Sequence, residues 1–130
     1  MRTILIGLIH ATWLLAACAA ETAPGDPATL PSEPRGAAAL EQMANAFDGG
    51  PSQAVIKARL DAAFALYGLQ PTEDNYSRAG STLVSLRRAN GATEMAILDY
   101  MICSHVPGVR MTFPEAAAVA SVMLKSGDRC

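Results

Sequence analysis

The residues best suited to chemistry lie in one short segment, Met101-Ile102-Cys103-Ser104-His105, with Met111 a little further along the chain. Thioether, thiolate and imidazole groups are the soft ligands that Cu(I) prefers in proteins. Met101 and His105 are four residues apart, a spacing that places two side chains on the same face of a helix. Met101, His105 and Met111 are therefore candidate ligands of a small copper-binding protein.

The same residues also have ordinary structural roles, and these are the stronger expectation. Methionines commonly fill irregular gaps in apolar cores. A histidine near the end of a helix can satisfy free carbonyl groups and interact with the helix dipole. A cysteine that is part of a disulfide offers no thiolate to a metal. We therefore expect no metal and no other cofactor, and copper binding remains the alternative.

The segment is a poor match to a catalytic site. Cys103 and His105 are only two residues apart, so on a helix they point to nearly opposite sides and do not form a nucleophile–base pair. Asp99 lies six residues before His105, a poor separation for orienting it. The chain contains no nucleophile elbow, phosphate loop or zinc signature. We expect a protein that is not an enzyme.

A targeting signal precedes these residues. The chain starts with a basic Arg2, continues with an apolar stretch over 4–17 and reaches the tetrapeptide Leu15-Ala16-Ala17-Cys18. A basic start, an apolar segment and small residues at the junction are the parts of a secretory signal peptide. The apolar stretch is shorter than the ~20 residues of a membrane-spanning helix. An ordinary signal peptide with an incidental cysteine is the alternative interpretation.

The tetrapeptide resembles the lipobox of bacterial lipoproteins. That resemblance implies that residues 1–17 are removed and that Cys18 carries acyl chains, including palmitate, that anchor the protein in a membrane; two or more chains anchor stably. Ala19 and Ala20 lack the aspartate that favours inner-membrane retention in enterobacterial lipoproteins. The resemblance thus implies an outer-membrane anchor and a domain facing the periplasm.

Once Cys18 is lipidated, only Cys103 and Cys130 remain. In an oxidising compartment such a pair is more often a structural disulfide than a catalytic or metal site. We expect it to fasten the C-terminal end of the chain. An intermolecular disulfide or a free thiol is the alternative.

Composition excludes one class of partner. Without Arg2, the 10 basic residues of the chain become 9 against 12 acidic ones, a net charge near −3. Nucleic-acid binding requires clustered Lys and Arg, and Arg87-Arg88 is the only adjacent basic pair. We interpret that pair as a solvated helix face and expect no nucleic-acid partner.

Proline spacing separates an extended tether from a folded domain. Pro24, Pro27, Pro31 and Pro34 recur within residues 18–36. Proline lacks an N–H and disfavours helix in the residue before it, so this stretch should be extended, with a reach of up to about 50 Å. Residues 37–130 form one small domain, large enough for a modest core.

Capping signals and apolar periodicity predict an all-α fold for that domain. We expect helices over 37–47, 52–67, 72–89 and 93–105, and a fifth that begins at the Thr112–Glu115 capping box and ends near 125. Ile56, Leu60, Ala63, Phe64 and Tyr67 follow the period of a helix with one buried face. The prediction is a bundle of four or five short helices, with Gly80 marking close helix packing.

The leading functional interpretation is a non-catalytic binding or structural module of the cell envelope. It would bind an envelope protein as an accessory subunit, an exclusion or immunity factor, or a stress factor. Val119, Val122, Met123 and Leu124 on the last helix are candidates for a face that binds the partner. Packing in the core is the alternative role for each of them.

Overall fold

The domain consists of five α-helices. The computed structural model describes residues 36–130; the signal segment, Cys18 and the tether up to residue 35 lie outside the described residues. Within 36–130 there is no strand, so the all-α prediction is confirmed. The helices are α2 (Ala37–Ala46), α3 (Gln53–Tyr67), α4 (Glu73–Asn90), α5 (Glu94–Cys103) and α6 (Phe113–Lys125).

Side-chain caps determine where four of these helices begin. The hydroxyl groups of Ser52, Thr72, Thr93 and Thr112 each accept a hydrogen bond from the backbone N–H three residues further on. Each cap satisfies a donor that the helix itself leaves unpaired, which is worth about 1 kcal/mol. The predicted capping box before α6 is present, with the Glu115 side chain accepting from the Thr112 N–H. These caps are local, which is why the predicted helix starts lie within one residue of the observed ones.

The end of α5 differs from the prediction. The helix was expected to continue through His105, but it ends at Cys103. Pro107 disfavours helical geometry in the residue before it, and the Ser104 hydroxyl already bonds to the Tyr100 carbonyl oxygen at 2.5 Å. His105 therefore lies beyond the helix, and its four-residue spacing from Met101 does not place the two on one helical face.

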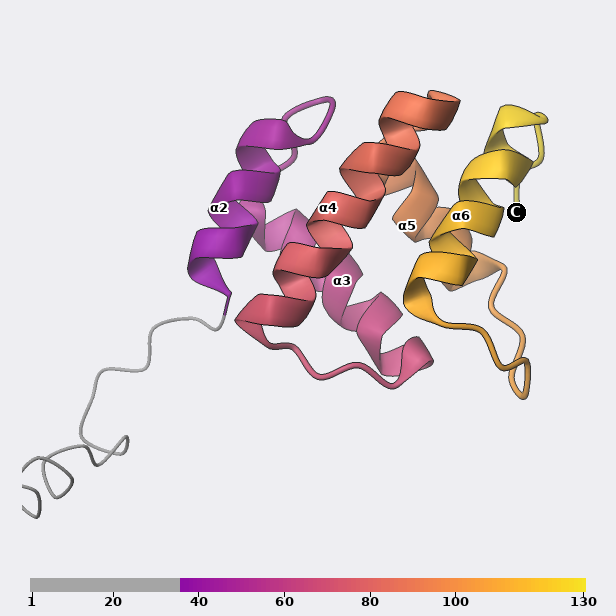
Figure 1. The fold of residues 1–130 in the computed structure, drawn as a ribbon, viewed down its shortest axis with the longest axis horizontal. Coiled ribbons are helices and arrows are strands. Elements are labelled where there is room, and N and C mark those ends of the chain that lie inside the picture. The colour runs from indigo at the N-terminus through magenta and orange to yellow at the C-terminus, as the bar shows by residue number, and fades with distance from the viewer. Residues whose placement is uncertain (1–35) are drawn as a thin grey trace, which may run out of the picture. The chain divides into compact units, whose positions relative to one another are not determined.

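The helices are arranged in two layers. Figure 1 shows α2, α4 and α6 side by side, with α3 and α5 behind them. Gly80 of α4 allows close contact with α2, because a Cβ atom there would lie 2.8 Å from Cγ of Met43. The prediction of close packing at Gly80 is confirmed.

Aromatic rings connect the core to the surface. Phe64 stacks on Tyr76 with ring centroids 5.3 Å apart and meets Phe113 edge to face at 5.7 Å. Tyr67 in turn contacts both Phe113 and His105, at 6.2 and 5.2 Å. Such geometries are favoured by the quadrupoles of the rings. The chain of rings ends at His105, close to the junction of α5 and α6.

Each helix contributes apolar side chains to a single core. As predicted, Ile56, Leu60, Ala63 and Phe64 of α3 are buried. None of the helices within 36–130 is long and apolar enough to cross a membrane.

Candidate functional site

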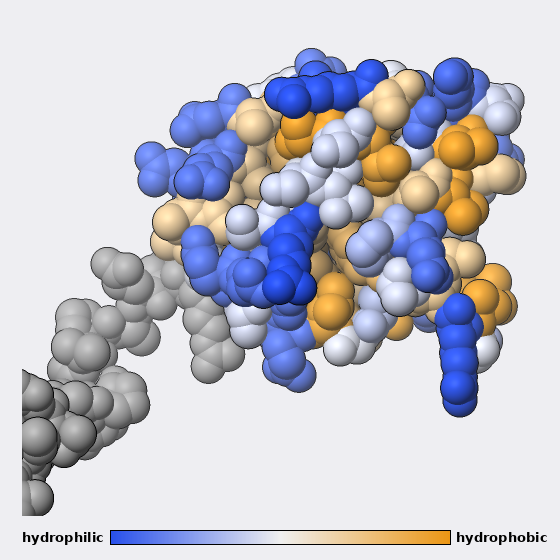
Figure 2. Space-filling view, in the orientation of Figure 1, coloured by the Kyte–Doolittle hydropathy of each residue, from blue (hydrophilic) through white to orange (hydrophobic). Residues whose placement is uncertain are grey.

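A groove beside α6 gathers exposed apolar side chains. It has a volume of about 280 Å³ and lies where the last turn of α5, the loop after it and α6 meet. Its lining residues include no Asp, Glu, Lys or Arg; they are Tyr67, Tyr100, Ser104, His105, Val106, Val109, Met111, Ala116, Val119, Ala120 and Met123. Figure 2 shows apolar surface along this edge of the domain.

The helical period of α6 produces one wall of the groove. Ala116, Val119, Ala120 and Met123 line it and follow the spacing of a single helix face. The Val106–Val109 loop forms the opposite rim, after the turn at Pro107-Gly108. Of the seven large hydrophobic residues exposed in the described chain, four line this groove: Val106, Val109, Val119 and Met123.

The four residues proposed as a partner-binding face on α6 are only partly gathered there. Val119 and Met123 line the groove and are exposed by 48% and 38%. Val122 is exposed but does not line it, and Leu124 packs against the core. The sequence pattern located the helix, but not the groove, because the opposite rim comes from a loop.

The candidate copper ligands are divided between two environments. His105 and Met111 line the groove, whereas Met101 is 1% exposed and does not line it. Met123 also lines the groove. However, α6 separates the backbones of Met111 and Met123 by roughly 15 Å at 1.5 Å per residue. The groove thus brings together one imidazole and one thioether of the proposed set.

His105 is held by ring packing. Its imidazole meets Tyr67 at an interplanar angle of 75°, and within residues 36–130 its ring makes no hydrogen bond or ion pair. Burial raises the pKa of the Tyr67 hydroxyl, so this phenol stays neutral. Tyr67 therefore adds no charge to the groove.

Cys103 and Cys130 form a disulfide within one chain. Their Cα atoms are 6.1 Å apart, inside the usual range for disulfides. The bond links the end of α5 to the C-terminal segment. It lies at a second, larger cleft of about 650 Å³ between α5 and the end of α6.

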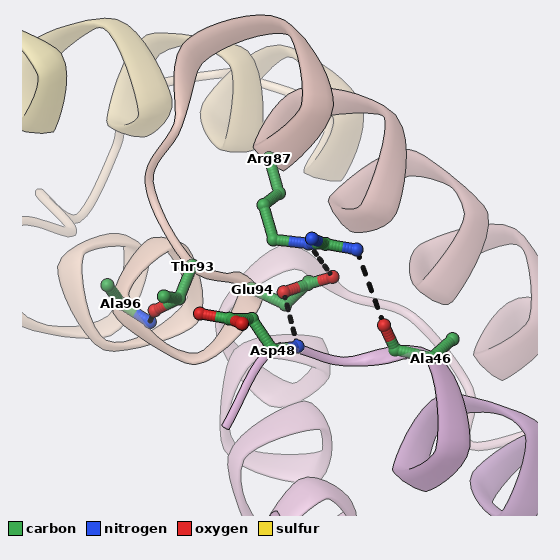
Figure 3. A network of polar contacts seen from close by, with 6 residues as sticks. All are labelled: Ala46, Asp48, Arg87, Thr93, Glu94 and Ala96. Carbon is green, nitrogen blue, oxygen red and sulfur yellow. Dashed lines mark hydrogen bonds and ion pairs between the residues drawn. The ribbon is translucent and has the colours of Figure 1, made fainter. Parts of the chain in front are cut away.

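A polar network at the other end of α5 was not predicted from the sequence. Glu94, the first residue of α5, is completely buried. Its carboxylate accepts from Nε of Arg87 at 2.7 Å and from the Asp48 backbone N–H at 3.1 Å, and Arg87 also reaches the Ala46 carbonyl oxygen at 3.4 Å (Figure 3). The interpretation of Arg87 as part of a solvated helix face is wrong, since its side chain is only 29% exposed and ion-paired. Arg88, the next residue, is exposed.

Other carboxylates also serve the fold. Glu73 accepts from the Ala39 N–H at 2.8 Å, capping α2 from a neighbouring helix, and Asp61 pairs with Lys57 and with the Tyr76 hydroxyl. Arg59 binds Asp99 at 2.7 Å. In the described part of the chain, no three His, Cys, Asp or Glu residues are grouped closely enough to hold a metal ion.

Comparison of the chain with protein-family models, with curated proteins and with solved structures found no match.

Proposed function

We propose that this protein is a lipid-anchored lipoprotein of the bacterial envelope whose helical domain is a non-catalytic docking module. The observation that carries the docking role is the mainly apolar groove beside α6, whose lining has no Asp, Glu, Lys or Arg. Its size, about 280 Å³, lies just below the range of about 300–1,000 Å³ that is typical of small-molecule sites. It suits a few inserted side chains of a protein better than a whole ligand.

The partner that fits this groove is an apolar helix face of another envelope protein. A helix binds a groove by inserting aliphatic side chains at positions three and four residues apart. Each fully buried aliphatic side chain contributes about 1.5–3 kcal/mol. Because the lining has no Asp, Glu, Lys or Arg, affinity would come mainly from apolar burial, and the exposed valines would contribute most of it.

The sequence motifs support a location at a membrane of the bacterial envelope. Leu15-Ala16-Ala17-Cys18 supports lipidation at Cys18, and the proline-rich residues 18–36 support a tether that lets the domain reach a partner away from the lipid surface.

Site-specific photocrosslinking in the native cells tests the docking role. A photoreactive amino acid at Val109 or Val119, in the groove, should give the same crosslinked envelope protein. Val55 is a matched control, because it is an exposed valine (45%) on α3 outside the groove. Equal crosslinking from Val55, or none from either groove position, would overturn the proposal.

Metabolic labelling with a palmitate analogue tests the anchor separately. The wild-type protein should incorporate label and fractionate with membranes, whereas Cys18→Ala should do neither. Wild-type protein that stays unlabelled and soluble would contradict lipidation while leaving the groove result intact.

Copper binding is the second candidate, and the structure weakens its original ligand set, because Met101 is in the core. His105 and Met111 share the groove and could supply two ligands. A competition titration with a Cu(I) chelator tests it: loss of binding in His105→Ala, but not in Met101→Leu, would support a site in the groove.

A further inference from the structure

The Cys103–Cys130 disulfide is at the surface of the domain. Both cysteines are exposed, and both line the cleft of about 650 Å³ beside α5. Exposed disulfides are the ones that thiols can reach without unfolding, and they are more often labile than buried structural ones. The position of this bond therefore allows a thiol to react with it while the protein stays folded.

The fold does not depend on this bond alone. All five helices contribute to the apolar core. The segment after α6 is also held by a hydrogen bond of 2.5 Å from the Tyr100 hydroxyl to Asp128, and the Asp128 N–H donates to the Met123 carbonyl oxygen at 3.0 Å. Opening the disulfide should thus leave the helices in place.

The charges in the cleft favour an incoming thiolate. Lys125 and Arg129 line it, and the only carboxylate among its lining side chains, Asp99, is ion-paired with Arg59. Cations near a cysteine stabilise its thiolate form. They also attract the thiolate of a reductant, since it carries the opposite charge. This matters because the thiolate, and not the thiol, is the form that attacks a disulfide.

The two sulfur atoms are not equivalent. Cys103 is the last residue of α5, where the partial negative charge of the helix end disfavours another anion. Cys130 lies outside any helix, in the segment after α6 that also carries Asp128 and Arg129, so no helix end disfavours its thiolate. The better leaving thiolate is therefore Cys130, and the sulfur to be attacked is Cys103.

We propose that Cys103–Cys130 is a thiol–disulfide exchange site, and that the cleft receives a dithiol-bearing envelope protein. The donor thiolate attacks Sγ of Cys103, which forms a mixed disulfide and releases Cys130 as a thiolate. The second donor thiol loses its proton and attacks the donor sulfur, which releases Cys103. The donor is oxidised by two electrons to a disulfide, and the two protons pass to Cys103 and Cys130. This activity is independent of the docking groove and of the anchor.

Reduction of the full-length protein by dithiothreitol tests the site. The reduced fraction is followed by alkylation and mass spectrometry, with helix content followed by circular dichroism. We expect a rate that rises linearly with dithiothreitol concentration and a helical signal that persists after reduction. A rate that saturates at the unfolding rate, or loss of the helices on reduction, would overturn the proposal.

Charge variants test the cleft itself. Lys125→Gln combined with Arg129→Gln should slow reduction by about 3-fold or more at low salt, and the difference should shrink at high salt because salt screens exposed charges. Arg110→Gln is the control, since Arg110 is exposed and does not line the cleft. Equal rates in all variants would show that the cleft plays no part in exchange.

The direction of attack has its own readout. A monothiol such as glutathione carries no second thiol in the same molecule to resolve the mixed disulfide, so an adduct trapped by acid early in the reaction can be located by peptide mapping. The proposal requires it on Cys103. An adduct mainly on Cys130 would overturn the assigned order of attack.

Discussion

The two ends of α5 differ in burial: its start is buried and hydrogen-bonded, whereas its end is exposed. At its start, Glu94 is completely buried and hydrogen-bonded to Arg87 and to the backbone of Asp48. At its other end, exposed valines border an apolar groove and an exposed disulfide borders a cleft. Within residues 36–130 every buried side-chain nitrogen and oxygen has a hydrogen-bond partner. At the start of α5 the buried polar groups are thus hydrogen-bonded within the domain. At its end, apolar side chains and the disulfide remain exposed to other molecules.

This contrast separates stability from function along a single helix. A buried carboxylate with its partners holds segments together, and removing one partner leaves a charge without compensation. Exposed apolar side chains contribute little to the stability of the fold. Their burial by a partner stabilises the complex. We therefore expect substitutions at the Glu94 end to change stability, and substitutions at the groove to change binding.

The largest effect should come from Arg87→Ala. It leaves the Glu94 carboxylate buried without its cation, which should lower the free energy of unfolding by about 3–5 kcal/mol. Urea denaturation measures the change. Arg88→Ala is the matched control and should change it by less than about 0.5 kcal/mol, because Arg88 is exposed. Equal losses in the two variants would remove the distinction between these arginines.

The double variant Cys103→Ser and Cys130→Ser should come next. The disulfide closes 27 residues, which on the chain-entropy model corresponds to a loss of about 3–4 kcal/mol. The domain should nevertheless remain helical without urea, and reduced wild-type protein should match the variant. A double variant that is already unfolded without urea would show that the core needs the disulfide.

A smaller, pH-dependent effect is expected for Tyr100→Phe. The hydrogen bond to the Asp128 carboxylate is the main cause that raises the pKa of Tyr100 above its usual 10.0, followed by burial. The folded state therefore favours the neutral phenol. Its contribution should be complete below pH 10 and lost as the pH rises through the raised pKa. Wild type and variant should differ in melting temperature at pH 8 and converge at strongly alkaline pH; a constant difference would contradict this.

The smallest effect on stability should come from Val109→Ser combined with Val119→Ser. Both side chains are about half exposed, so the free energy of unfolding should change by less than about 0.5 kcal/mol each. Photocrosslinking to the partner from a probe at Val106, which is exposed and lines the same groove, should nevertheless be lost. Val122→Ser is the control, an exposed valine on the same helix that does not line the groove, and it should retain the partner.

Much of the fold could be predicted because its signals are local. Ser52, Thr72, Thr93 and Thr112 cap helices through bonds that span three residues. Gly68 ends α3 in the left-handed conformation, with φ of 68°. The error at the end of α5 arose because the turn at Pro107-Gly108 acts over several residues, so the last helical residue is not marked by a capping residue of its own.

The candidate sites were harder to predict because their parts are distant in sequence. His105 and Met111 could be named from their chemistry, but the groove also needs Tyr67 and α6. The Glu94 network joins residues 7 and 46 positions apart. A polar residue after the cap Thr93 is a normal first-turn residue in a helix, so nothing in the pattern marked Glu94 as buried.

The sequence by itself determined the all-α class and where the helices begin, since caps, glycines and apolar periodicity act within one or two turns. It also determined which residue types were available for chemistry. Only the tertiary structure decided that Met101 is in the core while His105 is in a groove, that Arg87 is paired while Arg88 is free in solvent, and that the disulfide is exposed. Burial depends on how α3, α5 and α6 pack against one another, and those contacts join segments tens of residues apart.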